Sequence, residues 1–209
     1  MPLAKRMGLS IADHMKKIYF LRHGHTPLTG TYVGSTDCGL SAQGVEQIQA
    51  VAASPALQEA TRIIASPMLR CVQTVAELTG KYQVSYHPLL KEIDFGFWEG
   101  LTFDQVYTKY QQEFDLWCSS PATFSFPGGE SVADFRARMK QIIPLLNTCA
   151  DERIMVVAHG GVICHLLCIL LGLPLDNYTL LKLDVGHYAS VDLYETGAVL
   201  TGFNKSISG

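Results

Sequence analysis

The sequence predicts an α/β protein, a three-layer sandwich in which helices flank a mainly parallel central sheet. Short apolar runs that favour strands alternate with longer segments of helical periodicity, the pattern of βαβ units. Two of these runs, 18–21 and 154–158, show no polar alternation, so we expect strands buried on both faces. Nearly half of the 209 residues are apolar, which suits one domain with a substantial core.

Composition narrows the possible partners. A net charge of −3 gives no basic field for nucleic acid and no polybasic patch for a membrane. The longest apolar run, 162–173, is too short and too interrupted to span a bilayer. Cys164 and Cys168 lie one helical turn apart and, with His165, suggest a metal site, but a buried apolar helix explains them better. The six cysteines form no Cys-x-x-Cys pair, so we expect a reducing, cytoplasmic compartment.

The first strand, 18–21, ends abruptly in Arg22, His23 and Gly24. A buried strand that ends in a cation and an imidazole places them at the edge where open α/β sheets bind ligands. Gly24 has no Cβ, so we expect it to permit a sharp turn and the close approach of a bound group. Residues 1–15 show no clear periodicity and are expected to form a peripheral leader.

The elements after the first strand follow from turn and cap signals. After a loop over 27–40, Ser41 is a plausible N-cap for a helix that extends to about residue 53. A second strand is expected over 61–65. Ser66 should cap a helix whose first residue is Pro67.

Arg70 lies in the first turn of that helix, so its side chain is expected to reach back toward the strand ends. A short third strand should follow over 83–86.

A segment over about 95–130 differs from the rest and is expected to form a small cap beside the site. It holds ten of the twenty aromatic residues of the chain, and a helix is expected over 102–114. Most of these rings should hold the cap on the sheet, and one or two should line a pocket for an apolar or aromatic leaving group. The ten are Phe95, Phe97, Trp98, Phe103, Tyr107, Tyr110, Phe114, Trp117, Phe124 and Phe126.

The last third of the chain completes the sheet. Ser131 should cap a long amphipathic helix that Pro144 kinks or ends. A buried helix is expected over 161–171, and two late strands over 188–194 and 198–203.

Two strand ends of this chain present His-Gly, at His23 and at His159. Packing alone hardly explains such a repeat, whereas two histidines and two arginines, Arg22 and Arg70, suit a phosphoryl group. The planar guanidinium pairs with two phosphate oxygens at once. A neutral imidazole is a competent nucleophile near pH 7, so His23 is assigned as the group that takes the phosphoryl.

Four blocks of the sequence, in this order, resemble the histidine phosphatase superfamily, which is also called phosphoglycerate-mutase-like. The first block departs from the commonest form only at His25, where many members carry Glu. The blocks are 21–26, 66–74, 92–100 and 158–161.

The resemblance implies a phosphohistidine at His23 that water later hydrolyses. It implies that Arg22, Arg70 and His159 hold the non-bridging oxygens, and the helix after Gly160 adds backbone donors. Glu92 occupies the position of the general acid.

Asp94 and Glu99 are the alternatives for that acid. Thr29 and Ser35 are expected at the rim of the substrate pocket. No metal and no cofactor are expected, because the cations neutralise the phosphate charge.

The expected activity is that of a phosphomonoesterase on a small molecule, in a monomer or homodimer. The block over 92–103 resembles that of the bacterial alpha-ribazole phosphatases of cobalamin assembly, and an aromatic cap suits a flat base. Sugar-phosphate or fructose-2,6-bisphosphate phosphatases share the same blocks and remain alternatives. The short aromatic segment disfavours a phosphoglycerate mutase. The intact set of site residues disfavours a non-catalytic domain that only binds phosphorylated ligands.

Overall fold

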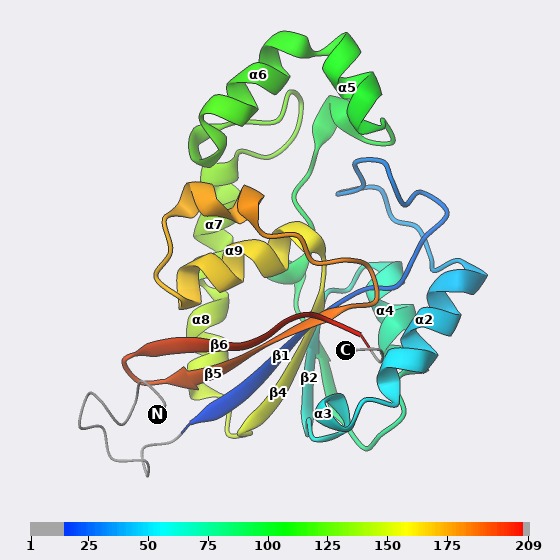
Figure 1. The fold of residues 1–209 in the computed structure, drawn as a ribbon, viewed down its shortest axis with the longest axis vertical. Coiled ribbons are helices and arrows are strands. Elements are labelled where there is room, and N and C mark those ends of the chain that lie inside the picture. Colours follow the sequence, from blue (N-terminus) through cyan, green and yellow to red (C-terminus); the bar gives the residue numbers. More distant parts are fainter. Residues whose placement is uncertain (1–14, 207–209) are drawn as a thin grey trace.

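A six-stranded mixed sheet forms the centre of the computed structural model, which describes residues 15–206 (Figure 1). The strand order is β3-β2-β4-β1-β5-β6. Strands β1 to β4 pair in parallel, and β5 and β6 add antiparallel at one edge. The bounds are β1 Lys16–Arg22, β2 Arg62–Ala65, β3 Gln83–Tyr86, β4 Arg153–Ala158, β5 Tyr188–Tyr194 and β6 Gly197–Lys205. The expected α/β class with a mainly parallel sheet is confirmed.

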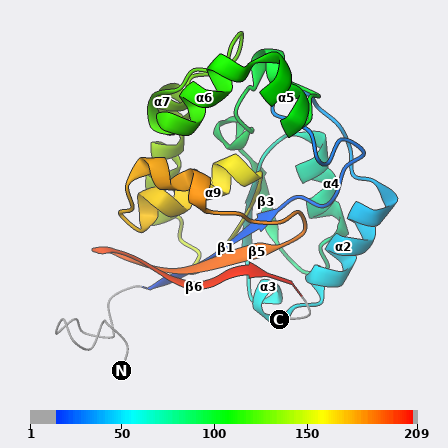
Figure 2. The same ribbon diagram turned by 45° about the horizontal axis from the view of Figure 1, so that its top comes forward.

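Helices cover both faces of this sheet (Figures 1 and 2). Within the described residues, no helix combines the length and the apolar character that a bilayer crossing requires. The helices are α2 Ala42–Ala52, α3 Pro55–Gln58, α4 Leu69–Glu77, α5 Phe103–Lys109, α6 Gln111–Ser119, α7 Val132–Lys140, α8 Ile142–Thr148 and α9 Gly160–Leu170. Short 3₁₀ turns are η1 Pro88–Leu90, η2 Gly96–Trp98, η3 Pro121–Thr123 and η4 Leu175–Leu180. The expected leader lies, apart from Met15, outside the described residues.

Successive side chains of β1 enter two separate cores, because a strand points alternate residues to opposite faces. Ile18 and Phe20 pack with α7, α8 and α9, and Tyr19 and Leu21 pack with α2, α3 and α4. All four side chains are buried, which explains why the run lacks polar alternation.

The register between β1 and β4 determines where the site forms. Arg22 lies opposite Ala158 at the end of the parallel pair, and the His23 backbone N–H donates to the Ala158 carbonyl at 3.0 Å. His23 and His159 therefore both stand one residue beyond neighbouring strand ends, on the same edge of the sheet.

Two helix starts test the sequence-based expectations. Ser41 caps α2, since its side chain accepts the Gly44 backbone N–H. The prediction that Ser66 caps a helix beginning at Pro67 is wrong. Helix α4 begins at Leu69, and its N-cap residue Met68 offers no side-chain cap. The Ser66 hydroxyl is instead hydrogen bonded in the site, as described below.

Two expected helices are broken into pairs. The helix expected over 102–114 is interrupted at Tyr110, whose backbone leaves the helical region, so α5 and α6 are separate. The long helix after Ser131 breaks between Lys140 and Ile142. Pro144 explains this break, because it has no N–H for the Lys140 carbonyl and its ring clashes there.

Trp98 lies at the centre of the aromatic cluster in the segment over 95–130. Its side chain is fully buried, and its ring meets Phe126 edge to face at 5.2 Å and Tyr32 at 5.4 Å. Figure 1 shows α5 and α6 at one end of the molecule, on the side where β1 and β4 end. This ring cluster joins the α5–α6 pair to the core below it.

Replacing Trp98 with Ala should lower the free energy of unfolding by about 3–5 kcal/mol, the usual loss for truncating a buried aromatic residue. Denaturant unfolding would measure it. The neighbouring Phe97 is 65% exposed, so Phe97→Ala is the matched control, with a change within about 0.5 kcal/mol. Equal losses in the two variants would contradict the packing described here.

Candidate active site

Two imidazole rings face each other at the carboxyl edge of the sheet. The ring centroids of His23 and His159 lie 5.2 Å apart with an interplanar angle of 62°. His23 follows β1 and is 7% exposed, and His159 is the N-cap residue of α9 and is 1% exposed. The parallel pairing of β1 and β4 thus brings together the two His-Gly turns that the sequence shows 136 positions apart.

The hydrogen bonds of His23 determine its tautomer. Its Nδ1 lies 2.8 Å from the Gly24 carbonyl oxygen, which can only accept, so Nδ1 carries the proton. The lone pair of the neutral ring is therefore on Nε2. An imidazole held in this way can attack an electrophile through Nε2.

The ring of His159 is hydrogen bonded at both nitrogens. Nδ1 accepts from Arg70 Nε at 3.1 Å, so Nε2 carries the proton of the neutral ring and donates to the Ser66 hydroxyl at 2.8 Å. Ser66 is a site residue that the sequence reasoning missed. It directly follows β2, the other neighbour of β4, and this topology is the signal that indicates its position.

Burial lowers the pKa of both imidazoles well below the ordinary value. For His23, desolvation is the main cause and the Arg22 charge the second. For His159, desolvation again comes first, followed by His23 and the charge of Arg70. Both rings are therefore neutral at neutral pH.

Arg22 lines a cavity together with His23 and has an unused buried donor. Its Nη1 donates to the Leu183 carbonyl at 2.6 Å, whereas its buried Nε has no hydrogen-bond partner among residues 15–206. Burial lowers its pKa, but a guanidinium keeps its charge at any working pH. A buried, unpaired donor on a cation marks a position for an anionic acceptor.

Arg70 is 1% exposed and already makes several hydrogen bonds. Besides His159, its guanidinium donates to the carbonyls of Thr36 at 2.9 Å, Gly34 at 3.1 Å and Val33 at 3.3 Å. A guanidinium has five N–H donors, so this residue orients His159 and holds the loop over 33–36 while its charge remains beside the cavity.

Glu92 is buried at 9% exposure on the same edge. Its Oε1 accepts the Ile93 backbone N–H at 3.0 Å, and its Oε2 accepts the Gly161 N–H at 2.9 Å. Desolvation raises the pKa of this carboxyl, although both hydrogen bonds and the charges of Arg70 and Arg22 oppose the rise. A carboxyl with a raised pKa suits proton donation.

Asp94 and Glu99, the two alternatives to Glu92 as general acid, do not lie where Glu92 does. Glu99 Oε1 accepts the backbone N–H groups of Gly34 and Ser35, each at 2.9 Å, so its carboxylate holds the loop. Asp94 Oδ1 accepts the Ser35 hydroxyl at 2.9 Å and the Gly96 N–H. Neither residue lines the cavity that holds His23.

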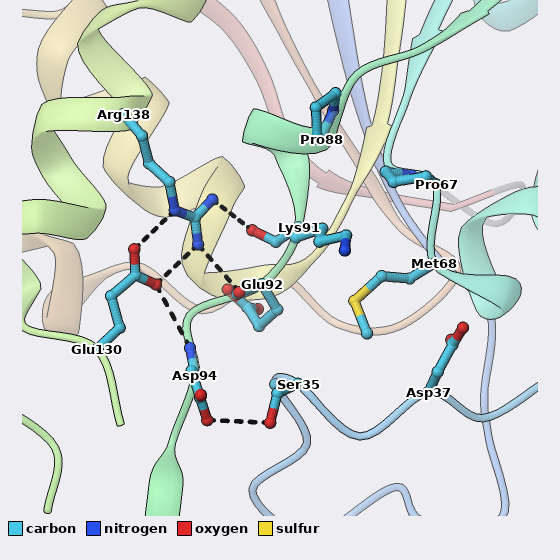
Figure 3. A pocket seen from close by; sticks show the side chains of 11 residues that line it. Ser35, Asp37, Pro67, Met68, Pro88, Lys91, Glu92, Asp94, Glu130 and Arg138 are labelled. Atoms are coloured by element: carbon cyan, nitrogen blue, oxygen red, sulfur yellow. Dashed lines mark hydrogen bonds and ion pairs between the residues drawn. The ribbon is translucent and has the colours of Figure 1, made fainter. Parts of the chain in front are cut away.

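Two neighbouring cavities share Glu92. The first, of about 230 Å³, holds His23, Arg22 and Arg70, together with Thr29 and Gly160. The second, of about 410 Å³, is shown in Figure 3 and contains Ser35 rather than Thr29. The two expected rim donors therefore lie in different cavities.

Glycines allow close packing around this edge. A Cβ on Gly161 would lie 2.6 Å from Glu92 Oε1, so any other residue at 161 would displace that carboxyl from its present position. A Cβ on Gly24 would lie 2.6 Å from the Gly44 carbonyl oxygen of α2. This glycine therefore makes room for helix α2, and the expected approach of a bound group stays a prediction.

The cysteine-rich helix α9 fits the expected apolar core. Cys164 Sγ donates to the Leu181 carbonyl at 3.3 Å, and Cys168 is fully buried. His165 stacks on Tyr178 with ring centroids 4.1 Å apart. Across residues 15–206, no cluster of three or more His, Cys, Asp or Glu side chains is placed to hold a metal ion.

Comparison with known proteins agrees with this geometry. Residues 18–206 match the model of the histidine phosphatase superfamily (branch 1). The chain belongs to the histidine phosphatase superfamily. The family expected from the sequence blocks is thus confirmed, and with it the enzyme class, since the homologues are phosphatases that act on phosphoric monoesters.

Three relatives illustrate the range of this family. Phosphoserine phosphatase 1 of Hydrogenobacter thermophilus is 27% identical over 91% of this chain and 92% of its own. Adenosylcobalamin/alpha-ribazole phosphatase of Escherichia coli is 25% identical over 92% of this chain and 98% of its own. The native structure of the mycobacterial glucosyl-3-phosphoglycerate phosphatase is 27% identical with a TM-score of 0.81, covering 91% of this chain and 99% of that one.

Proposed function

We propose that this chain is a metal-independent phosphomonoesterase in which His23 carries the phosphoryl group between substrate and water. One observation carries the proposal: the free lone pair of His23 Nε2 lies beside His159 in a cavity lined by Arg22 and Arg70. In this proposal residues 1–209 act as one histidine-phosphatase domain, and residues from about 95 to 130 are its cap segment.

The first step forms the phosphohistidine. His23 Nε2 attacks the phosphorus atom, and the bond from phosphorus to the ester oxygen breaks. Glu92 gives its proton to the departing oxygen and becomes a carboxylate. Arg22, through its unpaired Nε, and the charge of Arg70 stabilise the phosphoryl oxygens in the transition state.

The second step releases phosphate. Water attacks the phosphorus atom of the phosphohistidine, and the bond from Nε2 to phosphorus breaks. The Glu92 carboxylate takes a proton from the attacking water, which restores the carboxyl. In both steps Arg70 and Ser66 hold His159 beside His23, and the N-terminus of α9 at Gly160 lines the cavity that receives the phosphoryl group.

The substrate is proposed to be a small phosphomonoester with an apolar or aromatic leaving group. Tyr32 and Phe95 line the cavity that holds His23, together with Leu28 and Val33. These side chains suit the benzimidazole of alpha-ribazole 5′-phosphate, and the Escherichia coli relative bears that substrate in its name. Thr29 is the proposed hydroxyl contact on the same rim.

Rapid quenching tests the covalent step. With a ³²P-labelled phosphomonoester, the wild-type chain should retain label that acid releases and alkali preserves, the behaviour of phosphohistidine. His23→Ala should retain none and should lose roughly 10⁴-fold or more in turnover. His25→Ala is the control, since His25 Nδ1 bonds Ser41 outside the cavity. Label on the His23→Ala protein would overturn the proposal.

The pH profile tests the role of Glu92. His23 must be neutral, and its lowered pKa puts the acid limb below the ordinary imidazole range. Glu92 must be protonated, and its raised pKa puts the alkaline limb above the ordinary carboxyl range. In Glu92→Gln the alkaline limb should disappear, and alkyl phosphate turnover should fall about 10²–10⁴-fold. An unchanged alkaline limb would remove Glu92 from this role.

A substrate panel tests the leaving group. Alpha-ribazole 5′-phosphate should give a higher kcat/KM than fructose 2,6-bisphosphate, phosphoserine or 3-phosphoglycerate, and all released phosphate should appear in solution. A preference for a sugar phosphate would indicate the sugar-phosphate alternative. Transfer of the phosphoryl group to another hydroxyl of 3-phosphoglycerate would indicate a mutase, and binding without turnover would indicate a non-catalytic domain.

A further inference from the structure

Arg138 connects helix α7 to the segment that carries Glu92. Its Nη1 donates to the carbonyls of Leu89 at 2.6 Å and Lys91 at 2.7 Å, and its Nη2 donates to the Glu92 carbonyl at 3.0 Å. These carbonyls lie at and just beyond the end of the 3₁₀ turn η1, where a helical turn leaves its last carbonyls without partners. One side chain thus satisfies three backbone groups in four consecutive residues.

Glu130 holds Arg138 in this position. Arg138 Nε and Nη2 donate to the two Glu130 carboxylate oxygens at 2.8 and 2.9 Å, a two-point pair (Figure 3). Glu130 also bonds the same segment directly. Its carboxylate accepts the Asp94 backbone N–H at 3.4 Å, and its own N–H donates to the Asp94 carbonyl at 2.9 Å. The segment over 89–94 is therefore held on both sides of Glu92.

The Arg138–Glu130 ion pair is rigid enough to hold the main chain around Glu92 in place. The side chains of Arg138 and Glu130 are only 17% and 21% exposed. The Arg138 guanidinium also lies over the Phe135 ring, 4.3 Å from its centroid, and Phe135 is fully buried. A planar guanidinium that is packed on a ring and paired at two points has little freedom to turn.

This clamp matters because Glu92 has little tolerance for displacement. Its Oε2 accepts the Gly161 N–H at 2.9 Å, and its Oε1 lies where a Cβ on residue 161 would be only 2.6 Å away. A main-chain shift at Glu92 would withdraw the carboxyl from the departing oxygen. Displacements of about 1 Å at a catalytic group typically slow a reaction by about 10²-fold.

We propose that Arg138, clamped by Glu130, is the positioning residue for the general acid, and that it acts on proton delivery to the leaving group rather than on phosphate binding. The inference rests on the role of Glu92 proposed above. Arg138 lines the second cavity and not the cavity that holds His23, and its hydrogen bond to Glu92 is made to the main-chain carbonyl.

Leaving-group dependence separates this role from a structural one. Glycerol 2-phosphate releases a strongly basic alkoxide that needs a proton, whereas 4-nitrophenyl phosphate releases a stabilised phenolate that does not. Arg138→Met should lower kcat/KM for glycerol 2-phosphate by about 10- to 100-fold and should change 4-nitrophenyl phosphate hydrolysis little. Arg138→Lys should show the same selectivity with a smaller loss, because an ammonium cannot span the carbonyls and the carboxylate together.

Two further measurements complete the test. In Glu92→Gln/Arg138→Met, the loss for glycerol 2-phosphate should equal that of Glu92→Gln alone, because both changes remove the same function. Arg62→Met is the matched control. It breaks the Arg62–Asp151 pair at 3.0 Å, with side chains 29% and 20% exposed, at the start of β2, away from the site. This control should change neither ester selectively.

The inference would be overturned if Arg138→Met and Arg138→Lys lost kcat/KM equally on both esters. It would also be overturned if the losses in the double variant were additive. Either result would leave the proposed function intact. Should Arg138→Met fail to fold, Arg138→Lys alone decides between the two outcomes. Equal losses on both esters in Glu92→Gln itself would overturn the role of Glu92, and the inference about Arg138 with it.

Discussion

The parallel pairing of β1 with β4 is the constraint on which the site depends. It places Arg22 opposite Ala158, so the two residues that follow these strands meet as a pair of rings. Neither histidine would reach the other from a strand shifted by one residue, because such a slip turns every side chain to the opposite face. The two separate cores, on either face of β1, hold that register.

Burial sets the chemistry at this edge. Desolvation favours neutral forms, which lowers the pKa of both imidazoles and raises that of Glu92. The same burial is costly for two guanidinium groups, and backbone carbonyls offset part of that cost. A bound anion would offset more of this desolvation cost, because Arg22 Nε has no hydrogen-bond partner in the part of the chain that the structure describes.

The strands and most of the helices can be predicted from apolar runs and caps, because those signals are local, whereas the start of α4 and the breaks after α5 and α7 could not be placed in this way. The proximity of His23 and His159 could also be predicted, because parallel strands end at the same edge of a sheet. The role of Ser66 could not be predicted, because its hydroxyl is hydrogen bonded to the His159 ring, 93 positions away, and does not cap the helix that follows it. Likewise, the hydrogen bonds of Arg138 to the segment around Glu92 depend on packing between distant elements, which residue pattern alone does not encode.

The strand order has a consequence for synthesis. Strand β1 lies between β4 and β5, and it pairs with no strand nearer to it in the sequence. During translation the first strand therefore waits for residue 153 and beyond before its backbone groups find partners. Such distant pairings are slow to form, and His23 and His159 cannot meet before β1 and β4 have paired.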